Sequence, residues 1–257
     1  MTKILAITNQ KGGVGKTTTS VNLAASLANA GKRVLLIDLD PQANATMGSG
    51  ANKQVIQQTV YQVLLGELSI KSVRISELQG KYDLIPANRD LAGAEVEMVT
   101  LSQREIRLKA ALIEVIDEYQ YVIIDCPPAL NLLTLNALCA AHAVMIPMQC
   151  EYYALEGLSD LVNTIKKVRA NFNPRLRIEG LLRTMFDPRN ILAQQVSDQL
   201  QRHFGDKVYR TVIPRNVRLA EAPGFGLPVL YHDRQSKGAQ ARSEERRVGK
   251  ECRSRWS

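Results

Sequence analysis

The residues from Lys11 to Thr18 have the types and spacing that bind a phosphate chain. They lie between a short apolar segment and a segment rich in Ala and Leu. Glycines permit a tight backbone whose N–H groups point at phosphate oxygens, and a following helix adds its positive N-terminal end. In such a loop Lys16 contacts the β- and γ-phosphates and the Thr17 hydroxyl coordinates Mg²⁺. The predicted site comprises Lys11, Gly12, Gly13, Val14, Gly15, Lys16, Thr17 and Thr18. The alternative, a tight strand-to-helix turn without a ligand, does not require these residues in this order.

Carboxylates follow two other apolar runs. Asp38 and Asp40 end the run that begins at Val34, and Asp125 ends the run that begins at Tyr121. The carboxyl ends of parallel strands meet at one edge of a sheet, so these carboxylates are expected beside the phosphate loop. A lone carboxylate at a strand end is often only a helix cap or a turn residue. The combination with the phosphate loop favours a functional role for Asp125.

The elements that must position these residues alternate between strands and helices. Nearly all-apolar runs predict strands at residues 4–8, 33–38, 82–86, 121–125, 143–147, 178–185 and 208–213. Helical periodicity predicts helices at residues 16–30, 104–119, 155–170 and 192–204, and a further helix is expected at residues 54–65 after a polar loop. Alternation of this kind predicts an α/β fold with a single, doubly wound, mostly parallel sheet flanked by helices.

Composition sets the class of protein. The chain has 257 residues, 45% of them hydrophobic and 23% charged, which is typical of a globular domain and excludes a disordered chain. The formal net charge of +8 suggests a polyanionic partner. No apolar run approaches the ~20 residues of a membrane span. The four cysteines form no CxxC pair, and the N-terminus lacks the features of a signal peptide, so we expect a cytoplasmic protein.

The C-terminal tail departs from this pattern. Residues 243–257 contain five Arg or Lys, three acids and the only Trp, with no apolar face of useful length. We interpret residues 1–242 as one domain and residues 243–257 as a non-native or disordered basic tail that replaces part of a terminal helix beginning near Gly238. A basic amphipathic helix is the alternative, although three apolar residues would make a weak membrane anchor.

The loop carries a second lysine, Lys11, and this pattern resembles the deviant Walker A motif of the ParA/MinD-type ATPases. The resemblance implies a P-loop NTPase fold, ATP and Mg²⁺ as ligands, and a Lys11 that crosses a dimer interface to the ATP of the other subunit. A cation at that position would stabilise charge on the transferring phosphoryl group. The alternative for Lys11 is an ordinary solvated lysine. The resemblance further implies that Asp40 positions or activates the attacking water, that Asp125 acts on Mg²⁺ through a water, and that Asp38 supports the metal shell.

Three further segments resemble the chromosomal ParA proteins of the Soj type. They are residues 91–95, 149–157 and 213–223, and the resemblance covers nearly all of residues 1–242. It implies that Pro214 and Asn216 lie against the adenine, where a proline offers an apolar face and an amide pairs with a base edge.

Other families with the deviant Walker A motif would need residues or segments that can be looked for in this sequence. A nitrogenase iron protein would need cysteines that bridge a cluster between subunits, whereas Cys126, Cys139 and Cys150 stand in apolar surroundings that favour burial. A MinD-like membrane-associated positioning ATPase would end in an amphipathic membrane helix, and it remains the main alternative. Only ten residues precede Lys11, so we expect no helix-turn-helix domain of the plasmid ParA kind. A metabolic ATP-dependent ligase would need a small-molecule pocket, which the sequence does not reveal.

The resemblance therefore predicts an ATP-dependent DNA-partitioning ATPase. Mg-ATP would drive a sandwich homodimer that binds double-stranded DNA without sequence preference, and a ParB-type centromere-binding partner would stimulate hydrolysis to ADP and phosphate. Such a protein would associate with the nucleoid, and no membrane partner is expected. Among the C-terminal basic residues the resemblance singles out Arg189 and Arg218 for DNA, although a solvated surface charge is the commoner role of any one arginine.

Overall fold

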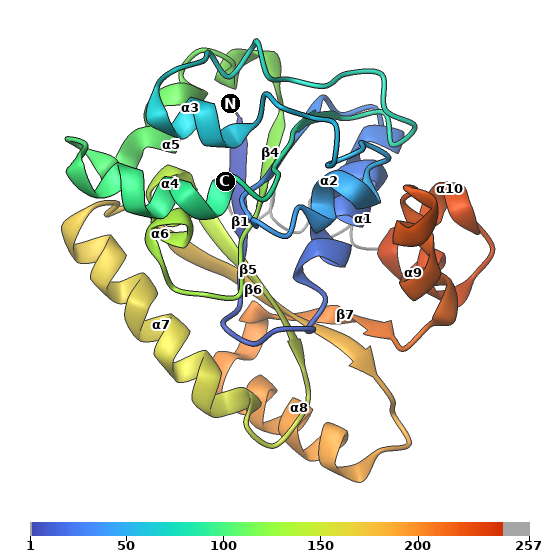
Figure 1. Ribbon diagram of the computed structural model, residues 1–257. Coiled ribbons are helices and arrows are strands. Elements are labelled where there is room, and N and C mark those ends of the chain that lie inside the picture. The colour runs from blue at the N-terminus through green and yellow to red at the C-terminus, as the bar shows by residue number, and fades with distance from the viewer. Residues whose placement is uncertain (1, 244–257) are drawn as a thin grey trace.

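Seven strands form one sheet in the computed structural model, which describes residues 2–243 (Figure 1). The strand order is β3-β2-β4-β1-β5-β6-β7, and every pair of neighbouring strands is parallel. The strands are β1 (Lys3–Ile7), β2 (Val34–Asp38), β3 (Asp83–Ile85), β4 (Tyr121–Asp125), β5 (Ala143–Gln149), β6 (Arg177–Phe186) and β7 (Val208–Pro214). The predicted single, doubly wound α/β sheet is confirmed.

Helices cover both faces of this sheet, as the crossovers of a parallel sheet require. They are α1 (Lys16–Asn29), α2 (Asn44–Gly48), α3 (Val60–Leu65), α4 (Leu91–Glu97), α5 (Arg107–Leu112), α6 (Leu132–Ala140), α7 (Ala154–Asn171), α8 (Ile191–Phe204), α9 (Val217–Glu221) and α10 (Val229–His232). Residues 237–243 are also helical and are called the C-terminal helical segment below. The sequence predicted a terminal helix near Gly238, and this segment begins there. Residues 244–257 of the predicted tail lie outside the described residues.

Alternate residues of each strand face two separate apolar cores. On β4, Val122 and Ile124 pack with α3 to α8, whereas Ile123 faces α1, α2 and the α9–α10 region. The strands are therefore apolar on both faces, which explains why they are visible in the sequence as nearly continuous apolar runs.

The predicted helix 104–119 is wrong in its extent. Only α5 is α-helical there, between short 3-10 turns at Arg104–Ile106 and Ile116–Glu118. The Asn136 side chain on α6 interrupts the helix, because its Oδ1 accepts from the Leu108 N–H and its Nδ2 donates to the Arg104 carbonyl. The helix expected within 54–65 is likewise confined to α3, where Thr59 and Gln62 form a capping box.

Candidate functional site

The predicted site residues lie on loops at one edge of the sheet, beyond the carboxyl ends of neighbouring strands. The phosphate loop follows β1 and Asp40 follows β2, and Glu151, which was not among the predicted site residues, follows β5. Asp125 ends β4 in register with Ile7 of β1 and with Asp38 of β2. The structure thus brings the phosphate loop and all three predicted carboxylates together, at the edge where open α/β sheets bind ligands.

The phosphate loop is held in shape from both sides. Gly13 and Gly15 have φ angles of 73° and 86°, in the left-handed region that favours glycine. Beneath the loop, the Thr184 hydroxyl of β6 donates to the Val14 carbonyl at 2.8 Å. At its start, the Asn9 carboxamide accepts from the Lys11 N–H and donates to the Pro147 carbonyl. The loop leads directly into α1, whose first N–H groups have no acceptor within the helix and are available to an anion.

The two loop lysines occupy different environments. Lys16 is 7% exposed, and its ammonium lies 3.1 Å from the Lys11 carbonyl. Burial lowers the pKa of Lys16, against the opposing effect of Asp125 and Asp40. A bound polyanion would stabilise this buried cation. The Lys11 side chain is instead exposed and forms an ion pair with Glu151 at 2.5 Å.

Asp125 joins the N-terminal end of α1 to the sheet. Its two oxygens accept hydrogen bonds from the Thr17 hydroxyl at 2.8 Å and the Ser20 hydroxyl at 2.7 Å. The carboxyl is completely buried, and burial, aided by the nearby Asp38, raises its pKa. A divalent cation here would relieve that penalty. No cluster of three or more His, Cys, Asp or Glu suited to a metal occurs in residues 2–243.

Asp38 and Asp40 shape the segment after β2. Asp38 accepts from the Thr46 N–H and hydroxyl, both at 2.8 Å, and from the Asp40 N–H at 3.1 Å. Burial raises its pKa despite these bonds. One oxygen of Asp38 thus holds α2 and the other holds the Asp40 backbone, and its predicted support of the metal shell stays a prediction. Asp40 is 8% exposed. Its charge opposes the lowering of the Lys16 pKa and adds to the raising of the Asp125 pKa.

The residues predicted to face the base follow β7. Pro214 ends this strand, and Asn216 caps α9, its side-chain oxygen accepting from the Leu219 N–H at 3.2 Å. The α9–α10 region lies beside α1 (Figure 1). It is tied to that helix by the Val229 N–H, which donates to the Asn22 side chain at 2.8 Å. The contact of Pro214 and Asn216 with adenine stays a prediction.

Comparison with known proteins decides the family. A family model described as "AAA domain" matches residues 2–178. The sporulation initiation inhibitor protein Soj of Bacillus subtilis is 55% identical over 240 residues, which cover 93% of this chain and 95% of that protein. The chromosome partitioning protein ParA of Caulobacter vibrioides is 52% identical over 242 residues, covering 93% and 90%. The chain belongs to the Soj/ParA family of chromosome-partitioning ATPases.

Solved structures agree with this fold. A cobyrinic acid a,c-diamide synthase from Mycobacterium smegmatis with bound ATP analogue and magnesium has a TM-score of 0.85 and 39% identity, over 95% of this chain and 92% of that one. The cell division ATPase MinD of Pyrococcus furiosus has a TM-score of 0.80 at 23% identity, over 98% and 100%, and shows the fold alone. In residues 2–243 of this Soj/ParA family member, no helix is long and apolar enough to cross a membrane.

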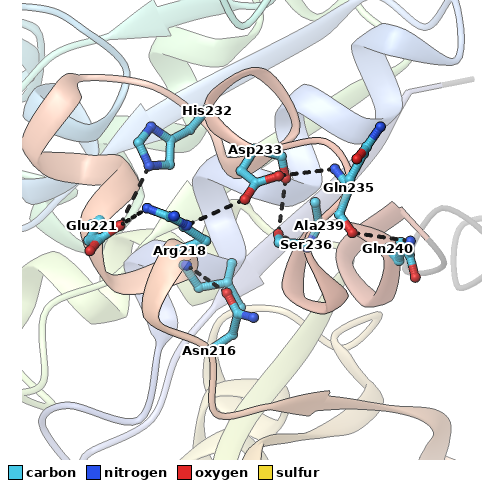
Figure 2. A network of polar contacts seen from close by, with 10 residues as sticks. Asn216, Arg218, Glu221, His232, Asp233, Gln235, Ser236, Ala239 and Gln240 are labelled. Atoms are coloured by element: carbon cyan, nitrogen blue, oxygen red, sulfur yellow. Dashed lines mark hydrogen bonds and ion pairs between the residues drawn. The ribbon is translucent and has the colours of Figure 1, made fainter.

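The two predicted DNA-binding arginines both have carboxylate partners in this Soj/ParA chain. Arg189, after β6, is paired with Asp187 through two nitrogens, at 3.0 and 2.8 Å. Arg218 on α9 contacts Glu221 at 2.9 Å and Asp233 at 3.4 Å (Figure 2). Both segments follow neighbouring strands at the edge that carries the phosphate loop. Their role in DNA binding stays a prediction, and the pairing means that a DNA phosphate would compete with carboxylates of the same chain.

Sequence reasoning missed several residues that build this site. Ser20 lies one helical turn after Thr17, and that spacing is a signal that both hydroxyls face the same strand end. Thr46 lies eight residues after its partner Asp38, and Thr184 lies 170 residues from Val14. No local pattern predicts contacts of that range.

Proposed function

We propose that this chain is a DNA-partitioning ATPase whose Mg-ATP complex forms a sandwich dimer. In this proposal the dimer binds double-stranded DNA without sequence preference, and a ParB-type partner stimulates hydrolysis. The observation that carries it is the position of Lys11. Its side chain extends away from its own phosphate loop to an exposed ion pair, while Lys16 alone is turned into the loop. A loop lysine in that position can reach a nucleotide held by a second subunit once its ion pair with Glu151 opens.

The chain's own residues have distinct tasks in this cycle. The N–H groups at the start of α1 and the Lys16 ammonium bind the phosphates, and Thr17 with Asp125 would hold Mg²⁺, which neutralises phosphate charge when bound. Asp40 orients the attacking water and accepts its proton. Lys11 of each subunit stabilises the charge that develops on the other subunit's phosphate, so hydrolysis depends on dimerisation.

DNA binding tests the proposal directly. Gel shifts on unrelated duplexes, in ATP, in ADP and without nucleotide, should show binding in ATP alone. Lys11→Ala should bind ATP, remain monomeric by light scattering and fail to bind DNA. Asp40→Ala should dimerise in ATP, bind DNA and hydrolyse ATP poorly. Equal DNA binding in all three nucleotide states, or a normal dimer of the Lys11 variant, would contradict the proposal.

Vesicle sedimentation distinguishes the MinD-like alternative. If the protein co-sedimented with anionic lipid vesicles in ATP and did not bind DNA, the membrane-associated positioning function would be favoured over DNA partitioning. A ParB-type protein added to the DNA-bound dimer should raise the hydrolysis rate and release the DNA.

A further inference from the structure

The C-terminal helical segment packs against the helix that opens at the phosphate loop. Its Arg242 side chain is 2% exposed, and the guanidinium Nη1 donates to the Thr19 hydroxyl of α1 at 2.9 Å. One face of α1 supplies a second contact, since the Ser26 hydroxyl donates to the Arg242 carbonyl at 3.4 Å. The positive charge of Arg242 is thus buried against the first turns of α1.

The direction of these hydrogen bonds is fixed by chemistry. A guanidinium can only donate, so the Thr19 oxygen accepts and its own proton is left for another acceptor. That acceptor is the Gly15 carbonyl, 2.7 Å away. The chain of bonds therefore runs from Arg242 through Thr19 to Gly15, the residue that precedes α1.

The Gly15 carbonyl and the Lys16 N–H belong to the same peptide group. Lys16 is the first residue of α1, so its N–H has no acceptor within the helix and points out of the N-terminus toward the phosphate position. A charge-assisted donor at the far end of a hydrogen-bonded chain polarises each member, and burial reduces screening by solvent. The effect is a fixed peptide plane and a more strongly donating N–H.

The same segment also approaches the proposed base side. It begins beside the polar network around Asp233 (Figure 2). A Cβ added at Gly238 would lie 2.8 Å from the Leu219 side chain and 3.0 Å from Cγ of Asn216. Glycine therefore permits this close approach, and the segment is packed at both of its ends.

We propose that Arg242 is a positioning residue for nucleotide binding, acting through Thr19 on the peptide group between Gly15 and Lys16. The inference rests on the proposed assignment of residues 11–18 as the phosphate site. Because ATP and ADP would both contact this peptide group, Arg242 strengthens the binding of both and has little effect on the hydrolytic step.

Nucleotide titration of purified full-length variants tests this inference. Arg242→Met should raise the Kd of both ATP and ADP about three- to tenfold, the size of one ordinary hydrogen bond, because Arg242 acts through Thr19 and does not contact the nucleotide itself. It should raise KM with kcat nearly unchanged. Arg242→Lys retains a donor and should restore most of the affinity. Hydrogen exchange of the phosphate-loop amides should accelerate in the Met variant. The matched control is Arg234→Met, which removes an exposed charge nearby and should leave Kd unchanged.

Thr19→Val tests whether Arg242 acts through the Thr19 hydroxyl or only stabilises the fold. It should reproduce the rise in Kd, and combination with Arg242→Met should add little, because both variants break one chain of bonds. A folded Arg242→Met protein with wild-type Kd would overturn the inference. If that variant does not fold, a wild-type Kd for Thr19→Val overturns it equally. A separate Lys16→Met variant tests the underlying assignment, since its retention of nucleotide affinity would refute the phosphate site itself.

Discussion

The two lysines of the phosphate loop have identical side chains but differ in burial and in their partners. Lys16 is buried in a loop whose shape is set by glycines, whereas Lys11 is exposed and paired with Glu151. The sequence motif identified both lysines as candidate nucleotide-binding residues, because their spacing is typical of the deviant Walker A motif. It did not predict Glu151 as a partner, because 140 residues separate the two and only the order of β1 and β5 brings them together.

The Lys11–Glu151 pair must open before Lys11 can contact a second subunit. Exposed ion pairs contribute ~0.2–1 kcal/mol each, and a dimer would release two of them. Glu151→Gln should therefore lower the protein concentration for ATP-dependent dimerisation about two- to thirtyfold, as measured by analytical ultracentrifugation. Glu156→Gln, an exposed acid on α7, is the charge-matched control. Weaker dimerisation of the Glu151 variant would show that this carboxylate acts within the dimer instead.

His142 predicts a pH dependence of stability. Its Nδ1 accepts from the Ile4 N–H at 3.1 Å. Burial lowers the pKa of His142 below its usual value of about 6.5, and nearby cations lower it further: Arg177, Arg175, Lys109 and Lys3. The unfolded chain thus binds the proton more readily than the folded one, and stability is lost as the pH falls from 6.5 toward the folded pKa.

Denaturant unfolding at several pH values would check this. The free energy of unfolding should fall as the pH is lowered through this window, and the loss should be smaller in His142→Asn, whose amide oxygen can still accept from Ile4. An identical pH profile for the two proteins would contradict the assignment.

At the scale of elements, strands were more predictable than helices. Strands buried on both faces are apolar along their whole length, so their positions follow from composition and agree with the structure to within two residues at most ends. The N-terminal part of helix 104–119 was overestimated because its interruption there comes from Asn136, a residue of another helix. The phosphate loop and the strand-end carboxylates were predictable because strand, loop and helix are consecutive in the chain. Contacts such as Thr184 to Val14 and Arg242 to Thr19 depend on the final packing.

The ion pairs of Arg218 in the α9–α10 region predict that carboxylates of the same subunit compete with DNA for this arginine. Arg218 and Glu221 lie one turn apart on α9, and Asp233 follows α10 (Figure 2). Glu221→Gln removes one competitor for the Arg218 guanidinium. The affinity for DNA in ATP should rise about two- to fivefold, in line with the ~0.2–1 kcal/mol of an exposed ion pair. Fluorescence anisotropy would measure it, with Glu67→Gln as a control for net charge far from this region. Reduced DNA affinity would show that Glu221 holds Arg218 in its binding position.

At the scale of the whole molecule, one edge of the sheet carries both the predicted ATP site and the predicted DNA-binding segments. Arg189 and Arg218 follow the last two strands, and the phosphate loop follows the central strand β1. Within residues 2–243, the ion pairs of the two arginines are with Asp187, Glu221 and Asp233 and not with the phosphate loop. Nucleotide would therefore control DNA binding by assembling two subunits, each with a set of basic residues too small to hold DNA well alone.

Salt dependence distinguishes this mechanism from binding by single subunits. Each phosphate contact releases counterions, so the slope of log K against log salt counts the contacts, and a dimer should show about twice the slope of a monomer. Asp40→Ala in ATP supplies a long-lived dimer, and Lys11→Ala in ATP supplies the monomer. Arg189→Glu combined with Arg218→Glu in the Asp40→Ala background should abolish DNA binding, while light scattering still shows the dimer. Unrelated duplexes should bind equally, because phosphates carry no sequence information. If monomer and dimer gave the same slope, or the double variant kept its affinity, DNA binding would have to depend on a different surface and a different switch.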